Sequence, residues 1–320
     1  MQGFLSLRAK EIEKIVFMAP IKFKEAILMK KVFFMVFVLM FATLSLSQLA
    51  LVDDLGRLIT FEKDVERVVS AAPTVSDYIK HLGLEEKVVG VTDWDTNIQS
   101  EKIGNLVPLN IEKIISLNPD LVFLSGGFQE PEVSRLEKFN IKSFVINPVN
   151  FNDIYRDLVL IGTILGESQK AEKLSNELRQ KVLNIAKESF TWTNKPTVLY
   201  LMVQNNVAEI WTPGTGSYIN ELISYAGGVN LAAPYSGNNG FLQVGPEFVV
   251  SQDPDIIIVD SYYEGDELAK NTIINAPQFK NLKAVKQGKI VMVDGNKISQ
   301  ASPSLIDVLE QLYQYFRDNK

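Results

Sequence analysis

NIEKIISLNPDLVFLS, residues 110–125, predicts a short amphipathic helix, a turn at Asn118-Pro119 and then an apolar, buried strand. The same pattern returns 135 positions later as GPEFVVSQDPDIIIVD, residues 245–260, with its turn at Asp253-Pro254. The identical pairs are Glu112 and Glu247, Ser116 and Ser251, Pro119 and Pro254, and Asp120 and Asp255. Four identities in sixteen positions, together with a matched apolar pattern, indicate two lobes of the same construction.

Short apolar runs alternate with stretches of helical periodicity on both sides of these two blocks. The expected strands are residues 65–70, 87–91, 121–125, 142–146, 197–203, 209–211, 256–260 and 289–293. The expected helices are residues 75–82, 110–117, 130–139, 217–226, 245–251 and 304–317. Strands that alternate with helices in this way predict α/β layers with parallel sheets.

The middle of the chain, residues 152–165 and 168–189, contains neither proline nor a long loop. Apolar residues at helical spacing predict one long amphipathic helix there: Ala171, Leu174, Leu178, Val182 and Ile185. Two lobes joined by a helix leave a cleft where the carboxyl ends of parallel strands meet. The expected boundaries are an upstream extension and leader at 1–47, a lobe at 48–150, bridging helices at 151–190 and a lobe at 191–320.

The segment that begins at Met29 is typical of a secretory signal peptide. Two lysines precede a 15-residue uncharged run, residues 32–46, and the small residues Ser45 and Ser47 suit cleavage after Ser47. An uncleaved anchor is the alternative, because the apolar segment extended to Leu51 reaches about 20 residues. Met29 is an alternative start codon to Met1. Without residues 1–47 the chain carries 25 Lys and Arg against 35 Asp and Glu, which favours solubility.

Composition excludes several classes of function. The 320 residues include no Cys and a single His, His81. Disulfides, thiolate chemistry, Fe–S clusters, a lipid-modified cysteine and His-rich zinc or manganese sites are therefore excluded. A formal net charge of −6 argues against nucleic-acid binding, which needs a basic surface.

No arrangement of residues predicts catalysis. The Gly-rich TPGTGSY, residues 212–218, lacks the Gly-Lys-Ser/Thr ending of a phosphate-binding loop, and Ser217 is expected to cap the next helix. Asp93 and Asp95, on either side of Trp94, are expected in a solvated loop turn. His81 is expected at a helix surface or end. We therefore expect a protein that is not an enzyme.

The chain resembles the periplasmic binding protein family for vitamin B12 and ferric siderophores, the secreted component of importers driven by ATP hydrolysis. The resemblance covers nearly all of residues 65–315 and rests on the order and spacing of six blocks. They are VERVVSAAPTVSDYIKHLG (65–83), VVGVTDW (88–94), the two repeat blocks, GTGSYINELISYAGGVNLA (214–232) and ASPSLIDVLEQL (301–312). The resemblance implies two Rossmann-like lobes bridged by one long helix, with limited closure around the ligand.

Aromatic residues near strand ends are the candidate ligand contacts. The resemblance implies that Trp94 and Phe241 face the ligand, because the family presents aromatic residues at these two places. Phe128, Trp211, Tyr262 and Tyr263 are further candidates, since each is expected to follow a strand. Flat rings suit a large, partly apolar planar ligand. Ser299, in the loop before Pro303, is a candidate rim residue.

A cobalamin or related corrinoid is the favoured ligand, because aromatic walls and Asn-rich loops suit a large ligand with amide arms. A ferric siderophore is the next candidate, although an anionic catecholate complex needs converging Arg or Lys, and Lys297 is the only cation expected in the cleft. Haem needs a Tyr or His ligand, which Tyr262 or Tyr263 supplies. In every case the chelate is cargo, and no resident cofactor is expected.

The resemblance also implies partners: the permease and ATPase subunits of an ABC-type importer. In the family one Glu in each lobe docks onto Arg residues of the permease, and Glu112 and Glu247 occupy these positions. The simpler interpretation of each is a first-turn Glu stabilised by the helix dipole. We expect a periplasmic monomer. The alternatives are a haem-binding protein of the same fold and an envelope sensor not coupled to transport.

Overall fold

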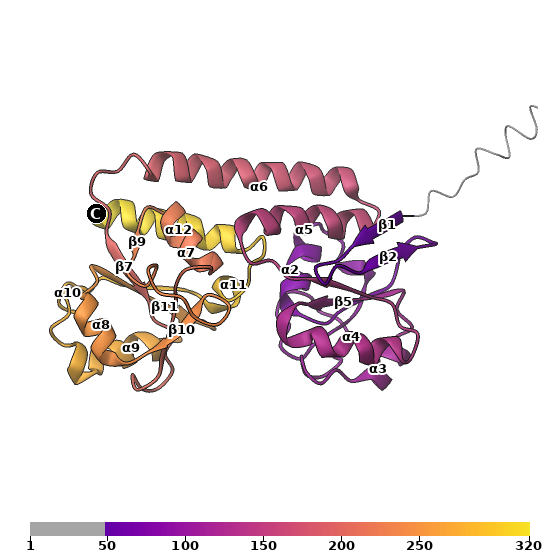
Figure 1. Ribbon diagram of the computed structural model, residues 1–320, viewed down its shortest axis with the longest axis horizontal. Helices are drawn as coiled ribbons and strands as arrows, with labels where there is room; N and C mark the ends of the chain where they lie inside the picture. The colour runs from indigo at the N-terminus through magenta and orange to yellow at the C-terminus, as the bar shows by residue number, and fades with distance from the viewer. Residues whose placement is uncertain (1–48) are drawn as a thin grey trace, which may run out of the picture. The chain divides into compact units, whose positions relative to one another are not determined.

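Two parallel sheets organise the computed structural model, which describes residues 49–320 (Figure 1). The first sheet has the order β4-β3-β5-β6 and the second the order β12-β11-β7-β9. The first-sheet strands are β3 (Val68–Ser70), β4 (Val88–Val91), β5 (Leu121–Ser125) and β6 (Ser143–Ile146). The second-sheet strands are β7 (Thr197–Tyr200), β9 (Val229–Asn230), β11 (Ile256–Ser261) and β12 (Ile290–Asp294). The prediction of two α/β lobes with parallel sheets is confirmed.

Helices cover these sheets, which is why the central strands are apolar on both faces. Residues 121–124 of β5 and 256–260 of β11 are all buried. The first-lobe helices are α2 (Pro73–His81), α3 (Ile111–Ser116) and α4 (Glu130–Glu137). The second-lobe helices are α7 (Tyr218–Tyr225), α8 (Pro246–Gln252), α9 (Leu268–Asn275), α10 (Lys283–Lys286), α11 (Gly295–Ile298) and α12 (Leu305–Asn319).

Two helices join the lobes: α5 (Phe151–Ile164) and the 22-residue α6 (Ser168–Ser189). α6 packs against α5 and also against α12 of the second lobe (Figure 1). The crossing of α5 and α6 needs a glycine at position 162, because a Cβ there would lie 2.2 Å from the Cβ of Ala171. The predicted long helix is confirmed, with the boundaries expected from the sequence.

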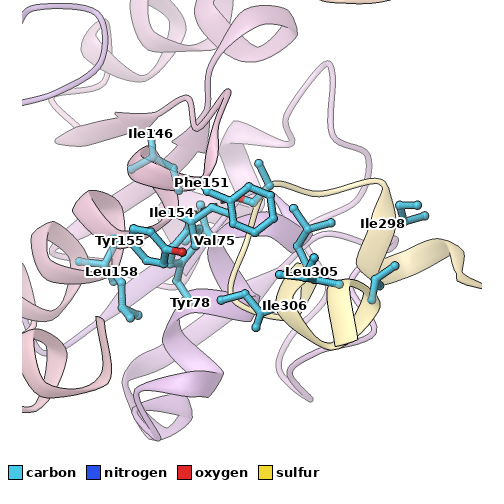
Figure 2. Close-up of a cluster of buried hydrophobic side chains, with 14 of the residues drawn as sticks. Val75, Tyr78, Ile146, Phe151, Ile154, Tyr155, Leu158, Ile298, Leu305 and Ile306 are labelled. Carbon is cyan, nitrogen blue, oxygen red and sulfur yellow. Dashed lines mark hydrogen bonds between the residues drawn. The ribbon is translucent and has the colours of Figure 1, made fainter. Parts of the chain in front are cut away.

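One apolar core runs through both lobes (Figure 2). It includes Val75 and Tyr78 of α2, Phe151 of α5, and Leu305 and Ile306 of α12, each at most 2 % exposed. The lobes are therefore joined by packed side chains as well as by the bridging helices. Close packing of this kind fixes the position of the packed helices relative to one another.

Two antiparallel pairs differ from the expected pattern. Residues 209–211 were expected as a strand of the parallel layers, and this prediction is wrong. β8 (Ile210–Pro213) instead pairs with β10 (Phe241–Val244) in a separate two-stranded sheet. The hairpin of β1 (Leu49–Val52) and β2 (Leu58–Phe61) was not predicted. Its turn covers the edge of β6, since the Val145 N–H donates to Asp53 and the Asp54 N–H to the Val145 carbonyl.

The expected leader, residues 1–47, lies outside the described residues. Between residues 49 and 320 there is no helix whose length and hydropathy would let it span a bilayer.

Candidate functional site

Trp94 stands at the carboxyl end of the first sheet, in the loop that follows β4. Asp95 builds this loop: its Oδ1 accepts hydrogen bonds from the Asn97 N–H (2.8 Å) and the Ile98 N–H (3.1 Å). The expectation that Asp95 is solvated is wrong, because the side chain that holds the turn is buried. The neighbouring Trp94 is 64 % exposed as a result. Asp93 is exposed, as expected.

Phe128 takes the corresponding place after β5, in the short 3₁₀ helix η2 (Gly127–Gln129). The buried Gln129 holds that turn: its amide donates to the Ala71 carbonyl (2.8 Å) and the Leu106 carbonyl (2.9 Å), and its Oε1 accepts from the Ser125 N–H. With Gln129 directed inward, Phe128 is 56 % exposed. The first lobe thus presents two exposed rings at the carboxyl edge of its sheet, where α/β proteins bind ligands.

Tyr262 and Tyr263 follow β11 in the second lobe and line a cavity of about 360 Å³. The other lining residues are Ser261, Glu264, Met292, Val293, Asp294 and Asn296. Gly295 makes room for the Tyr262 ring, because a Cβ at this position would lie 2.7 Å from ring atoms. The backbone of Tyr262 is fixed as well: its N–H donates to Asp266 and its carbonyl accepts from Asn296.

The Tyr262 hydroxyl lies near the buried carboxylate of Asp260. Burial raises the pKa of Tyr262, and the negative charge of Asp260 and the hydrogen bond to it raise it further. Burial likewise raises the pKa of Asp260. A phenol whose ionisation is opposed in this way is a poor axial ligand for a ferric ion. Tyr263, which is 71 % exposed, is the freer phenol of the two.

Phe241 and Trp211 both lie in strands, which corrects the expectation that Trp211 follows one. Phe241 begins β10 and is half-buried, with its ring edge-on to Tyr218 at 6.4 Å. The Tyr218 hydroxyl donates to the Ile298 carbonyl, which ties this pair to α11. Trp211 lies in β8, exchanges backbone hydrogen bonds with Met202 and does not line the cavity beside Tyr262 and Tyr263.

A second cavity, of about 380 Å³, lies between the lobes. Its lining from the first lobe is Asp77, Lys80, His81, Thr96 and Asn97. Its lining from the second lobe is Asp294, Asn296, Lys297, Ser304 and Asp307. Asp294 and Asn296 line both cavities, so the tyrosine-lined cavity adjoins the one between the lobes. The loop of Trp94 reaches the same cavity through Thr96 and Asn97.

Charges of opposite sign balance in the cavity between the lobes. Lys297, the predicted cation, forms an ion pair with Asp307 at 2.7 Å, and this bond raises its pKa. Lys80 and His81 also line the cavity, and sequence analysis did not assign them to it. His81 is the last residue of α2, as expected. No Arg among residues 49–320 lines either cavity, and Ser299 is exposed but lines neither.

Several buried polar atoms in the loops after β4 and α11 have no hydrogen-bond partner within residues 49–320. They are Thr92 Oγ1 and Asp95 Oδ2 after β4, and Gln300 Oε1 and Ser302 Oγ after α11. Buried polar groups are normally satisfied, so unpaired ones at strand ends indicate places for water or ligand atoms. The described residues contain no group of three or more His, Asp or Glu side chains that would hold a bare metal ion.

The Gly-rich segment 212–218 acts as a helix start. Ser217 Oγ accepts a hydrogen bond from the Ile219 N–H at 3.1 Å, so the predicted cap of α7 is confirmed.

The two repeat glutamates lie in the first turns of α3 and α8 and are exposed. Within residues 49–320 neither Glu112 nor Glu247 forms an ion pair or accepts a side-chain hydrogen bond. The other identical polar positions have structural roles. Ser116 and Ser251 each donate to the carbonyl three residues earlier, at 2.7 Å in both lobes. The glutamates are thus the identical polar pair that has no side-chain partner within residues 49–320.

Comparisons with known proteins agree with this architecture. The family model described as periplasmic binding protein matches residues 68–296. An uncharacterized ABC transporter substrate-binding lipoprotein, YvrC, of Bacillus subtilis is 26 % identical over 262 residues, covering 79 % of this chain and 81 % of the relative. A cobalamin-binding protein of Halobacterium salinarum is 27 % identical over 269 residues, covering 81 % and 72 %. The structure of the periplasmic heme-binding protein RhuT of Roseiflexus has a TM-score of 0.70 at 23 % identity, covers 80 % of this chain and 99 % of that one, and shows the shared fold.

Proposed function

The chain belongs to the periplasmic binding protein family, whose members bind rather than transform their ligands, and we propose that it captures a large, planar metal chelate outside the cytoplasm. The preferred ligand is cobalamin or a related corrinoid. The chelate is cargo that is taken up and released, and no resident cofactor takes part.

The observation that carries this proposal is the set of exposed rings at the carboxyl edges of the two sheets. Trp94 and Phe128 follow first-lobe strands, and Tyr262 and Tyr263 follow a second-lobe strand beside adjoining cavities. Exposed rings of this size are costly to leave in water and each stacking contact is worth about 0.5–1.5 kcal/mol beyond area burial. A flat macrocycle with apolar faces covers several of them at once.

Charge supports a corrinoid over an anionic ferric catecholate. Such a complex needs several cations that converge on it. Of the basic residues that line the cavity, Lys297 is paired with Asp307 and His81 lies beside Asp77, which leaves Lys80. Asn97, Asn296 and Thr96 instead offer neutral donors and acceptors around the cavity. These groups suit the amide arms at the edge of a corrin ring.

Delivery to an ABC-type importer is the second part of the proposal. Glu112 and Glu247 are exposed, unpaired and repeated once in each lobe, so a membrane permease with two similar subunits would meet the same group twice. Matching basic pockets on the permease would then orient the loaded protein. The name of the Bacillus subtilis relative supports a role with such an importer.

Haem is the second candidate ligand, and the exposed phenol of Tyr263 favours it. The purified chain distinguishes the ligands after incubation with cyanocobalamin, a ferric hydroxamate, a ferric catecholate or haemin and gel filtration. We expect cyanocobalamin absorbance to elute with the protein at one equivalent. Co-elution of a ferric siderophore or haemin alone would replace the corrinoid assignment, and co-elution of none would favour an envelope protein without a transport role.

A further inference from the structure

A polar contact joins α2 of the first lobe to the loop that precedes α12 of the second. The carboxylate of Asp77 accepts hydrogen bonds from the Ser304 N–H at 2.9 Å and the Ser304 hydroxyl at 2.6 Å. One residue further along α2, the Tyr78 hydroxyl donates to the Ala301 carbonyl at 3.0 Å. These residues are more than 220 positions apart in the sequence. Each bond therefore links the two lobes and does not merely support one of them.

The contact is buried. Asp77 is 2 % exposed and Tyr78 is fully buried, next to Leu305 and Ile306 in the shared apolar core (Figure 2). A carboxylate in such a place is stable only if its oxygens are hydrogen-bonded or paired with a cation. Ser304 supplies the hydrogen bonds, and one side chain that carries a positive charge when protonated lies next to Asp77.

That side chain is His81, one turn further along α2. Its Nδ1 lies 2.9 Å from the Asp77 carbonyl, which can only accept, and 3.5 Å from Asp77 Oδ1. Other charged groups line the same cavity between the lobes. They are Lys80 of α2, Asp294 and Lys297 at α11, and Asp307 of α12.

We propose that Asp77 is a positioning residue that fixes the separation of the two lobes, and that this joint loosens when His81 loses its proton. With a protonated imidazole, the buried carboxylate has both its hydrogen bonds and its counter-charge. With a neutral imidazole the carboxylate keeps only the hydrogen bonds, so the state in which Asp77 leaves Ser304 for water gains population.

The direction of the pH effect follows from the groups around His81. Burial alone would lower the pKa of His81, but the hydrogen bond and the charge of Asp77 outweigh it and raise that pKa. Asp77 in turn keeps a lowered pKa despite its burial, because of His81 and Ser304. The contribution of the joint is therefore full below the ordinary histidine pKa, about 6.5, and is lost as the pH rises through the raised value.

Spin-label distances measure the joint without any ligand, so the result does not depend on the proposed function. Because the sequence has no Cys, labels attach only where cysteines are introduced. Lys138→Cys in the first lobe and Lys286→Cys in the second replace exposed residues. We expect one narrow distance distribution at pH 5.5 and a broader one at pH 8.5. Identical distributions at the two pH values would overturn the proposal.

Four variants assign the effect. In His81→Gln, which removes the only His, the pH dependence should disappear; if it persists, His81 is not the switch. Ser304→Ala should broaden the distribution at both pH values, whereas Ser304→Thr, which keeps both donors, should behave as the unmodified chain. Asp157→Asn is the matched control, because burial raises the pKa of Asp157 to about 7 and this carboxyl titrates in the same range. The transition should survive in it, and its loss there would assign the switch to Asp157 instead.

Amide exchange at Ser304 provides a second measurement, because its N–H donates directly to Asp77. After correction for the intrinsic pH dependence, we expect exchange to be about two- to fivefold faster at the higher pH, the range for one weakened ion pair. If the corrected exchange rate of the Ser304 amide is the same at both pH values, the proposal is wrong. Thermal denaturation at each pH checks that the protein remains folded during the measurement.

Discussion

Asp120 and Asp255, which are 135 positions apart, make equivalent hydrogen bonds in the two lobes. Each carboxylate accepts from a backbone N–H at the beginning of the strand next to its own. Asp120 Oδ2 accepts from the Arg67 N–H at 2.9 Å, just before β3, and Asp255 Oδ2 accepts from the Thr197 N–H at 3.0 Å, at the start of β7. The turn before each has a left-handed residue at the same repeat position, Asn118 (φ 47°) and Asp253 (φ 43°). The repeat therefore reflects one structural unit used twice.

This equivalence predicts matched effects on stability. Burial opposes the charge of each aspartate, but hydrogen bonds and nearby lysines lower the pKa of Asp120 and of Asp255. A lowered carboxyl pKa stabilises the fold above about pH 4, and this contribution is lost as the pH falls through the folded-state value. We expect Asp120→Ala and Asp255→Ala each to cost about 1 kcal/mol at pH 7. Urea denaturation should show a smaller cost at pH 3, and an equal cost at both pH values would contradict the role of the carboxylates.

Trp94 should contribute to ligand binding and little to stability. Because the ring is 64 % exposed, Trp94→Ala should leave the melting temperature nearly unchanged. Loss of one stacking contact should weaken cobalamin binding about two- to tenfold. Trp192 is the matched control: it stacks on Tyr313 at 5.6 Å on the C-terminal helix, so Trp192→Ala should lower the melting temperature and leave affinity unchanged. If Trp94→Ala instead lowers the melting temperature and keeps full affinity, Trp94 is a core residue.

Gly295 should act on the ligand through Tyr262. A Cβ at position 295 would lie 2.7 Å from the Tyr262 ring, so Gly295→Ala should displace the ring and weaken binding. Tyr262→Phe keeps the ring and loses only the hydroxyl, which already bonds to Asp260. It should therefore bind cobalamin as the unmodified chain does. Calorimetric titration of both variants checks this, and equal affinity in Gly295→Ala would remove Tyr262 from the site.

Glu112 and Glu247 should affect transport and not ligand affinity. We expect the double variant Glu112→Gln, Glu247→Gln to bind cobalamin normally and to lose stimulation of ATP hydrolysis by the reconstituted importer. The loss should be largest at low salt, where exposed charges are least screened. Glu86→Gln with Glu209→Gln, one exposed glutamate in each lobe, is the control. Normal stimulation by the first double variant at low salt would exclude these glutamates as docking residues.

Local patterns in the sequence were sufficient for much of the fold. The strand at 121–125 and the helices at 151–164 and 168–189 follow from continuous apolar runs, turn residues and helical spacing, which depend on neighbours in the chain. The β1–β2 hairpin was missed because its contacts are distant: Asp53 caps the edge of β6 at Val145. No local signal in residues 49–61 reports that edge.

The site was predictable only in part, for the same reason. The sequence could place Trp94, Phe128, Tyr262 and Tyr263 because they end or follow strands, and the structure shows these rings exposed there. Their contact with a ligand stays a prediction. Lys80 and His81 were not found, since they become cavity residues only when the loop at 301–304 comes to α2. Asp95 was wrongly expected in solvent. Its side chain is buried because it accepts hydrogen bonds from the backbone of the turn, and the residue types around it do not show these bonds.

Fluorescence of Trp94 alone shows whether the chelate lies against the exposed rings at the carboxyl ends of the two sheets. The chain has three tryptophans, so Trp192→Phe with Trp211→Phe leaves Trp94 as the only reporter. Cobalamin absorbs in the range of tryptophan emission and should quench Trp94 strongly, with a plateau at one equivalent. If cobalamin elutes with this variant and the emission of Trp94 stays unchanged, the ligand binds elsewhere and the proposed site is wrong.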